Sequence, residues 1–244
     1  MINKENVHSN KMSCYTIGHS VHTLEDFIHI LKDNNVNYVI DIRSRPYNNY
    51  VRHFNRGFLS EKLKEHNIFY LYLGKELGDK CVNRDLLSSN GKVDFEKVSR
   101  TLKFNNGINK IIEKLEVGYN ISLMCSEGDP YKCHRFVLIS HALSKKGISI
   151  RHILKDRSII SNEMLEEKLL NNYEKDYQQA TLYGNVKTKW QAIESAYKKR
   201  GEDIAYKPGR HEITDEKSIF INDLDKPRGT EELGEMEEPE GPKL

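Results

Sequence analysis

The chain of 244 residues is long enough to bury a core without disulfide bonds, and its composition, 37% hydrophobic and 30% charged, is that of a globular protein. The formal net charge of +2 excludes a strongly basic polyelectrolyte, so any nucleic-acid-binding surface must be a local patch. No apolar run is long enough for a membrane span, and residues 1–12 lack the apolar core of a signal peptide. We therefore expect a cytoplasmic protein whose four cysteines are free, catalytic or metal-binding.

The first half of the chain alternates segments predicted to be strands with segments predicted to be helices. Short apolar runs predict strands at residues 14–18, 38–42 and 68–73. A helix is predicted to begin after Thr23, a favoured N-cap, because apolar residues follow it at helical spacing, namely Leu24, Phe27, Ile28 and Leu31. A short helix is expected around residues 58–66. The stretch 74–92 is rich in Gly, Asn and Ser and predicts a long surface connection.

The second half of the chain continues the same alternation. We predict a helix at 94–117 broken near Asn105-Asn106-Gly107, a strand at 121–125, a loop at 126–131, a helix at 132–146 ended by Gly147, and a strand at 148–154. Beyond residue 158 the chain is rich in charge, with helices predicted at 161–176 and 187–199. Residues 229–244 carry six Glu against one Lys, so we expect a disordered acidic tail there.

Strands that alternate with helices are typical of an α/β fold with a mostly parallel, doubly wound sheet and helices on both faces. The predicted organisation is a core domain at 13–157, a C-terminal helical extension at 158–207 and a polar tail at 208–244. Ligands of such sheets bind beyond the carboxyl ends of the strands. Three loops leave that edge, so we expect them to converge: His19 and Ser20, then Arg43 to Arg56, then Cys125 to Arg135.

The loop from Cys125 to Arg135 combines a thiol, acids and an imidazole. Cys125 ends a strand whose loop leads into a helix, a position where backbone N–H groups and the helix dipole lower the pKa of a thiol. Cys133 and His134 are expected in the first turn of that helix. Arg135 is expected to reach a phosphate or carboxylate of a substrate.

Two carboxylates in the same loop, Glu127 and Asp129, oppose ionisation of a neighbouring thiol. Glu127 is interpreted as a general base, as a partner for His134, or as an acceptor of a hydrogen bond from a substrate. Three interpretations stay open for the loop: a structural Cys125, a substrate site in which Cys125 or Glu127 acts chemically, and a zinc site. The zinc site would use Cys125, Cys133 and His134 with His19 or Glu127, although it lacks the short paired spacing of structural zinc sites.

The loop that follows the second predicted strand is basic and aromatic. After Asp41 and Arg43 it interleaves the basic residues Arg45, Arg52, His53 and Arg56 with the aromatic residues Tyr47, Tyr50, Phe54 and Phe58. Arginines neutralise phosphates and aromatic rings stack on bases, so the pattern favours a nucleotide or nucleic acid as partner. The alternative is a solvated loop whose aromatic side chains fold back onto the core.

These segments resemble the bacterial and archaeal domain-of-unknown-function family 488. The matching motifs are Thr16-Ile17-Gly18-His19-Ser20, Asp41-Ile42-Arg43-Ser44-Arg45-Pro46, Tyr72-Leu73-Gly74 with Glu76-Leu77-Gly78, and Leu123 to Arg135, followed by His152-Ile153 and the segment from Ala196 to Tyr206. The resemblance covers residues 14–207 approximately. It implies that His19, Asp41, Arg43, Cys125, Glu127, Cys133, His134 and Arg135 form a site, and it implies no activity, since none is assigned to the family.

A more distant likeness is to rhodanese-like sulfurtransferases. Asp41-Ile42-Arg43 on an early strand and a later strand that ends in Cys125 follow the order of those domains. The likeness implies a rhodanese-like three-layer sheet, with a persulfide on the strand-end cysteine in a cradle of backbone amides. Glu127, Asp129 and the longer loop depart from that pattern and count against persulfide transfer.

The leading hypothesis is an enzyme, a Cys- and Glu-dependent transferase or hydrolase, that acts on a nucleotide or a nucleic-acid-derived substrate. Cys125, Glu127 and His134 would be catalytic, and the substrate-binding residues would be His19, Ser20, Asp41, Arg43, Arg45, Tyr47, Asp129, Cys133 and Arg135. No cofactor or metal is expected under this hypothesis. The alternatives are a non-catalytic module that binds nucleic acid or another partner, sulfur transfer, and a zinc site.

Overall fold

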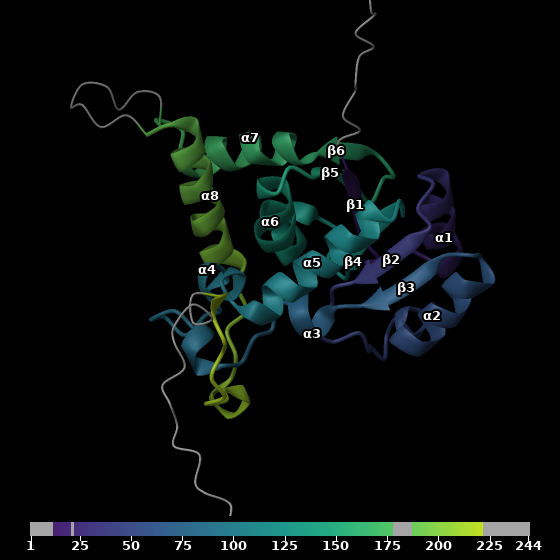
Figure 1. Cartoon of the computed structure of the whole chain (residues 1–244), viewed down its shortest axis with the longest axis horizontal. Helices are drawn as coiled ribbons and strands as arrows, with labels where there is room; N and C mark the ends of the chain where they lie inside the picture. The colour runs from purple at the N-terminus through teal and green to yellow at the C-terminus, as the bar shows by residue number, and fades with distance from the viewer. Residues whose placement is uncertain (1–11, 21, 178–186, 222–244) are drawn as a thin grey trace, which may run out of the picture.

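The computed structural model describes residues 12–20, 22–177 and 187–221, and a six-stranded sheet lies at its centre (Figure 1). The strands are β1 (Ser13–Gly18), β2 (Tyr38–Asp41), β3 (Phe69–Tyr72), β4 (Ile121–Cys125), β5 (Ser149–Ile153) and β6 (Ile159–Ser161). Their order is β3-β2-β4-β1-β5-β6, and β6 is antiparallel to β5 whereas the other pairs are parallel. The carboxyl ends of β1 to β5 therefore lie at one edge of the sheet.

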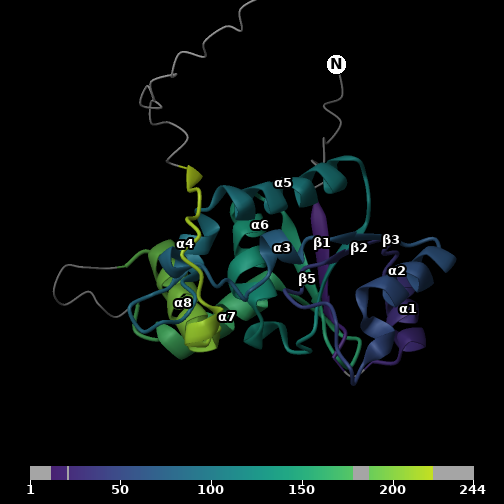
Figure 2. The same ribbon diagram turned by 90° about the horizontal axis from the view of Figure 1, so that it is seen from below.

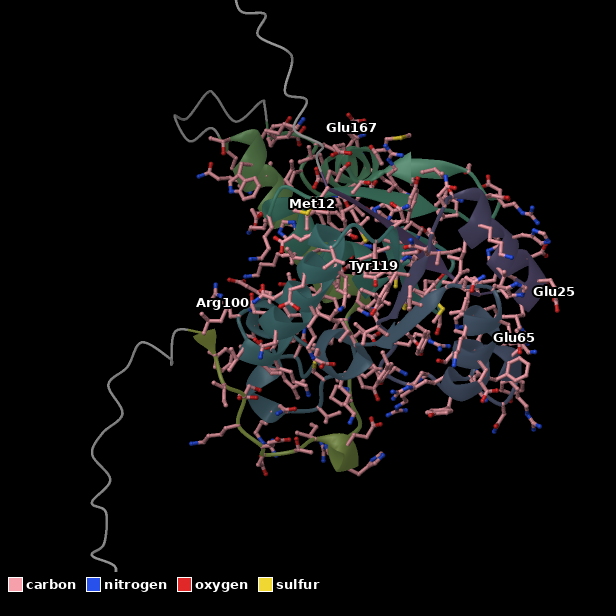
Figure 3. The ribbon with its side chains drawn as sticks, turned by 45° about the vertical axis from the view of Figure 1, so that its right-hand side comes forward. Met12, Glu25, Glu65, Arg100, Tyr119 and Glu167 are labelled. Carbon is pink, nitrogen blue, oxygen red and sulfur yellow. The ribbon has the colours of Figure 1, made fainter. Side chains whose placement is uncertain are left out.

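Helices cover both faces of the sheet (Figures 1 and 2). On one face α1 (Leu24–Asp33) and α2 (Arg56–Glu65) bury Phe27 and Leu59 against the sheet residues Ile17 and Met124. On the other face lie α5 (Leu102–Glu116) and α6 (His141–Lys145), which pack on a second cluster of apolar sheet residues. Figure 3 shows Glu25 of α1 and Glu65 of α2 on the outer side of their layer. The three-layer α/β fold with a mostly parallel sheet is confirmed.

Helix α1 forms where its capping residue and apolar spacing predicted it. The Thr23 hydroxyl accepts a hydrogen bond from the backbone N–H of Asp26 at 3.1 Å, which satisfies one of the free donors of the first turn. Phe27 and Leu31 are fully buried on the face toward the sheet. The helix ends at Asp33, and Asn35 follows in a left-handed conformation at φ 55°.

The predicted helix 94–117 is broken, but the predicted place of the break is wrong. The structure contains α4 (Phe95–Ser99) and α5, and the two meet at Thr101 rather than at Asn105–Gly107. Thr101 caps α5 by accepting a hydrogen bond from Phe104 N, while the Asn105 side chain donates to Ser99 O and Thr101 O. Gly107 stays helical because it lies against Leu77, and a Cβ there would come within 2.8 Å of that side chain.

The predicted α-helix 132–146 is also wrong in its first half. Pro130–Lys132 form a short 3₁₀ turn, Arg135–Ser140 form a π-helix, and only His141–Lys145 are α-helical, as α6. Cys133 is extended between the first two segments, and its sulfur accepts the backbone N–H of Arg135 at 3.5 Å, as an N-cap residue would. Cys133 therefore precedes the helix, whereas His134 lies in its first turn, as predicted. Gly147, at φ 82°, ends α6 as predicted.

The connection 74–92 contains more structure than its composition predicted. It begins with α3 (Gly74–Leu77), in which Gly74 and Leu77 are buried, and it later forms a 3₁₀ turn at Arg84–Leu86. The short strand β6 was not predicted at all. A three-residue strand carries too little alternation to be recognised in a sequence.

The C-terminal helices α7 (Asn162–Tyr173) and α8 (Lys189–Ile204) pack beside the π-helix at one end of the molecule (Figure 1). Residues 213–221 then return to the core domain, where Thr214 pairs with Asn83 and Phe220 pairs with Thr101. The acidic tail expected at 229–244 lies outside the described residues. Within the part of the chain that the structure describes, no helix is long and apolar enough to cross a membrane.

Candidate functional site

The carboxyl edge of the sheet brings the loops after β1 and β4 into direct contact. The backbone N–H of His19 donates to Cys125 O at 2.9 Å, and that of Ser20 donates to Ser126 O at 3.0 Å. Gly18 makes this approach possible, because a Cβ at that position would lie 2.0 Å from the Glu127 carbonyl oxygen. The predicted convergence of the loops is thus present in the structure.

A cluster of two cysteines and one histidine, Cys125, Cys133 and His134, lies beneath these loops. The Nδ1 atom of His134 is 3.7 Å from Cys133 Sγ and 3.9 Å from Cys125 Sγ, and the three ligand atoms all lie within 4.8 Å of one another. All three side chains are buried, with Cys125 the most exposed at 7%. We refer to these residues as the Cys–His cluster.

His134 is fixed by its other ring nitrogen. Its Nε2 is 3.3 Å from the carbonyl oxygen of Ile42, and because a carbonyl can only accept, Nε2 carries a proton. Asp79 faces the opposite nitrogen, with Oδ2 at 3.9 Å from Nδ1. Burial by itself would lower the pKa of His134, but Cys133 and Asp79 outweigh it and raise the pKa to about 9.

The two thiols of the Cys–His cluster respond in opposite directions. Burial opposes ionisation of Cys133, but hydrogen bonding from Cys125 and the positive charges of Arg135 and His134 bring its pKa well below the ordinary value. The hydrogen bond with Cys133, together with burial, raises the pKa of Cys125. In the absence of a bound cation, Cys133 is therefore the more readily ionised of the two thiols.

A second polar group at the same edge centres on Arg43. Its guanidinium donates to Asp41 through Nε at 2.9 Å and through NH2 at 2.7 Å, and NH2 also donates to Phe54 O at 2.8 Å. Tyr70 donates to the same carboxylate at 2.6 Å. Arg43 is 5% exposed, and Asp41 is fully buried. The donors of Arg43 are engaged in a buried ion pair and in holding the loop, which counts against the predicted contact of Arg43 with a substrate phosphate.

His19 belongs to the Arg43 group and not to the Cys–His cluster. Its Nε2 lies 3.2 Å from Arg43 NH1, and since guanidinium only donates, Nε2 must be the acceptor. Its ring stacks on Phe54 with centroids 4.3 Å apart. Burial and then the Arg43 charge lower the pKa of His19 to about 3. His19 is therefore a neutral hydrogen-bond acceptor for Arg43.

Arg135 is fully buried, which counts against its predicted contact with a substrate phosphate. Its NH1 donates to the Glu127 carbonyl and its NH2 to the Gly128 carbonyl at 2.8 Å, so the side chain ties down the loop after β4. No carboxylate is paired with it among the described residues. The positive charge of Arg135 helps to lower the pKa of Cys133.

The remaining residues of the loop after β4 point in several directions. Glu127 is exposed, and its Oε1 accepts a hydrogen bond from Asp129 N at 3.1 Å. The carboxylate that faces His134 is that of Asp79 and not, as one interpretation of the sequence expected, that of Glu127. Asp129 accepts from Tyr131 N at 2.9 Å and caps the 3₁₀ turn. Ser20 is partly exposed and lies against Gly128. The structure thus leaves Glu127 at the surface of the site and gives Asp129 a structural role.

The loop 43–58 leaves the sheet beside the Cys–His cluster and presents several side chains to solvent. Tyr47 is 67% exposed and Tyr50 is 95% exposed, whereas Phe54 is buried in the core. Arg45 is 61% exposed and pairs with Glu212 at 2.8 Å. The expectation that aromatic side chains of this loop fold back onto the core holds for Phe54 and fails for the two tyrosines.

Two functional residues escaped prediction, Asp79 and Tyr70. Asp79 accepts a hydrogen bond from Ser44 Oγ at 2.8 Å and thereby joins the loop 43–58 to His134. Asp79 lies in the connection 74–92, which is rich in polar residues, and no sequence motif there distinguishes it from its neighbours. Tyr70 lies in a predicted strand, but its partner Asp41 is on a different strand of the sheet, and sequence alone does not give strand neighbours.

Two buried histidines predict that the fold is sensitive to acid. In His152, Nδ1 lies 2.8 Å from Thr16 Oγ1 and Nε2 lies 3.2 Å from Asn162 Oδ1. Burial, with the Arg135 charge nearby, lowers the pKa of His152 to about 4, and the pKa of His19 is about 3. Unfolding returns both to ordinary values near 6.5, so the unfolded state binds protons that the folded state excludes.

We therefore expect the free energy of unfolding to fall as the pH is lowered from about 6.5 to 5, while most carboxylates stay ionised. Urea denaturation followed by circular dichroism at several pH values in this range measures the slope. A His152→Gln variant, which cannot titrate at this position, should show a shallower slope than the wild type. Equal slopes in the two proteins would contradict the assignment to His152.

The comparison with family models gives one match, and it covers most of the site. Residues 23–142 match Domain of unknown function DUF488, from the N-cap of α1 to the second residue of α6. The match includes Asp41, Arg43, Asp79 and the whole Cys–His cluster. No curated protein and no solved structure matched the chain. The predicted resemblance to this family is thus confirmed over residues 23–142.

Proposed function

We propose that this chain is an enzyme that acts on nucleic acid or on a nucleotide. The Cys–His cluster would be its reactive centre, and the loop 43–58 would contact the substrate. One observation supports this most strongly: a loop with exposed arginines and tyrosines begins at the cluster itself. Ile42 accepts a hydrogen bond from His134, and Ser44 donates one to Asp79.

The charge and aromatic content of the loop match the chemistry of a nucleic-acid strand. Residues 43–58 contain four arginines and no acidic residue, and Arg45, Arg52 and Arg56 are exposed. The exposed rings of Tyr47 and Tyr50 are available for stacking on bases. Arginines that neutralise phosphates beside stacking rings are the usual elements of a single-strand-binding surface.

The neighbouring residues offer acid, base and nucleophile. A Cys133 thiolate beside a protonated His134 would combine a nucleophile with a proton donor, and exposed Glu127 would serve as a base or as a hydrogen-bond acceptor for a substrate. Cys125 would influence the protonation of Cys133 through their hydrogen bond. The attacking thiol in this proposal is therefore that of Cys133, whereas the hypothesis from the sequence made Cys125 the nucleophile. The reaction class remains transfer or hydrolysis.

The binding half of the proposal predicts tight, salt-dependent association with a single-stranded oligonucleotide. Fluorescence anisotropy with labelled DNA and RNA, repeated over a range of salt concentrations, measures it. Tyr50→Ala should weaken binding about tenfold, because one stacked base contributes about 1–3 kcal/mol. Trp190→Ala, which removes an exposed ring from α8, is the matched control and should leave the affinity unchanged. Equal losses in both variants would refute a role for the loop.

The catalytic half is tested with a panel of nucleotides and oligonucleotides analysed for products. Cys133→Ala and Glu127→Gln should each abolish or strongly reduce turnover while the affinity for the oligonucleotide is kept. Wild-type turnover in both variants would refute the assigned roles. Binding without any product would favour the second candidate, a non-catalytic nucleic-acid-binding module.

Sulfur transfer receives less support from the geometry. Among the described residues no backbone N–H donates to Cys125 Sγ, whereas the one backbone donor to a sulfur of the cluster, Arg135 N, reaches Cys133. A persulfide on Cys125 would therefore lack the cradle of amides on which that chemistry depends.

A further inference from the structure

The Cys–His cluster has the composition and spacing of a tetrahedral metal site. We propose that it binds one zinc ion through Cys125 Sγ, Cys133 Sγ and His134 Nδ1, with the Asp79 carboxylate as the fourth ligand on the side nearest to solvent. This inference does not depend on the proposed action on nucleic acid. It would assign to the site an ion in place of the free Cys133 thiolate, so a bound ion would exclude Cys133 as the nucleophile considered above.

The distances within the Cys–His cluster agree with ligation of zinc. Zinc–sulfur bonds of about 2.3 Å and zinc–nitrogen bonds of about 2.0–2.1 Å at tetrahedral angles separate sulfur from nitrogen by about 3.6 Å. The two observed separations from His134 Nδ1 are 3.7 and 3.9 Å. The Sγ atoms of Cys125 and Cys133 and the Nδ1 atom of His134 are thus close enough to bind one ion without rearrangement of the fold.

The orientation of His134 is that of a metal ligand. Metal-bound histidines donate their second ring N–H to a carbonyl or carboxylate, which fixes the tautomer. Here Nε2–H donates to Ile42 O at 3.3 Å, and Nδ1, which would give up its proton when an ion binds, faces both cysteines. The carbonyl oxygen of Ile42, the residue that follows β2, therefore accepts the hydrogen bond that orients a metal-bound histidine.

Asp79 lies outside this group of three but is the carboxylate beside it, with Oδ2 3.9 Å from His134 Nδ1, and it would complete the set from a different segment of the chain. Its side chain is 34% exposed, whereas that of His134 is 3% exposed, so Asp79 forms the solvent side of the cluster. Ser44 Oγ donates to Asp79 Oδ1 at 2.8 Å and leaves Oδ2 toward His134. An ion could therefore enter past Asp79, and this carboxylate could close the site behind it.

A protease-like triad explains the arrangement less well. In a triad the nucleophile and the carboxylate lie on opposite nitrogens of the histidine. In this protein Ile42 takes one nitrogen, and both thiols and Asp79 meet at the other. Two thiols and an imidazole nitrogen that lie within 4.8 Å of one another, with a carboxylate beside the imidazole, are arranged as ligands around a cation.

Metal analysis of the full chain tests the proposal directly. Protein purified without chelators, or reconstituted with zinc under reducing conditions, should contain about one zinc per chain. Cobalt reconstitution should give visible bands of tetrahedral cobalt and sulfur-to-cobalt charge transfer in the near ultraviolet. Neither readout requires a substrate or an activity, so failure here leaves the proposed function to be judged by its own assays.

Variants then identify the ligands. Cys133→Ala, Cys125→Ala and His134→Ala should each lose the cobalt spectrum, while Cys14→Ala, which removes a buried thiol of β1 outside the cluster, should keep it. Asp79→Asn should weaken cobalt binding at least about tenfold and shift the visible bands. An unchanged spectrum in Asp79→Asn would overturn Asp79 as a ligand. No stoichiometric zinc or cobalt in the reduced wild-type protein, or a Cys125–Cys133 disulfide after purification, would overturn the site as a whole.

Discussion

Asp41→Ala is expected to lower the free energy of unfolding by about 3–5 kcal/mol, because removal of one partner of a buried ion pair strands the other charge. The Arg43 guanidinium is 5% exposed and makes two of its hydrogen bonds to this carboxylate. The Tyr70 hydroxyl would lose its acceptor as well. Urea denaturation of the purified variant followed by circular dichroism measures the loss, and wild-type stability would contradict a buried ion pair at the sheet edge.

Two further variants separate the buried ion pair from charge in general. Asp215→Ala removes a carboxylate that pairs with Arg84 at the surface, where both side chains are at least 66% exposed, and it should cost less than about 1 kcal/mol. The double variant Asp41→Ala/Arg43→Met should be more stable than Asp41→Ala alone, because the unpaired charge of Arg43 is then absent. A double variant less stable than Asp41→Ala would show that Arg43 holds the loop mainly through Phe54 O.

Arg135→Met is expected to destabilise the protein by about 2–3 kcal/mol and to release the loop after β4. Methionine fills a similar volume, but the carbonyls of Glu127 and Gly128 lose a charged donor, and such hydrogen bonds contribute about 1.5–3 kcal/mol each. Part of that loss is returned because a buried charge is removed. Faster hydrogen–deuterium exchange in residues 126–129 should accompany the lower stability.

Matched replacements in the same loop show whether the fork of Arg135 is the cause. Arg135→Lys keeps the charge but offers no planar fork for two carbonyls, so it should fall between the wild type and Arg135→Met. Lys132→Met, at an exposed position of the same loop, should change neither stability nor exchange. Equal exchange in residues 126–129 of Arg135→Met and the wild type would contradict the assigned role.

Most of the fold could be predicted because its elements are short, buried and regularly alternating. The strands up to β5 and the helix after Thr23 follow from apolar runs and one capping residue. The break before α5 could not be placed, because Asn105 and Gly107 break helices in isolation, whereas here Asn105 bonds to the preceding turn and Gly107 packs on Leu77. These two contacts depend on tertiary structure, which local propensity does not contain.

The location of the site was predictable, whereas the partners within it were not. Parallel strands require that the loops of His19, Arg43 and Cys125 meet at one edge. Which side chains pair there depends on strand order, and β4 lies between β1 and β2. As a result Arg43 pairs with Asp41 and His19 instead of a phosphate, and His134 faces Asp79 instead of Glu127.

The position of β4 also determines when the site can form during folding. β1 pairs with β4, in which Ser122 is the partner of Tyr15, and with β5, so its hydrogen bonds join residues more than one hundred positions apart. Such long-range pairing slows folding, because loop-closure entropy is lost before many contacts form. On the ribosome, β1 and β2 would wait for most of the core domain to be synthesised before β4 inserts between them. A chain interrupted before residue 121 would thus lack both the central strand and the cysteine-bearing loop that follows it, and the loops of His19 and Arg43 would have no common edge at which to meet.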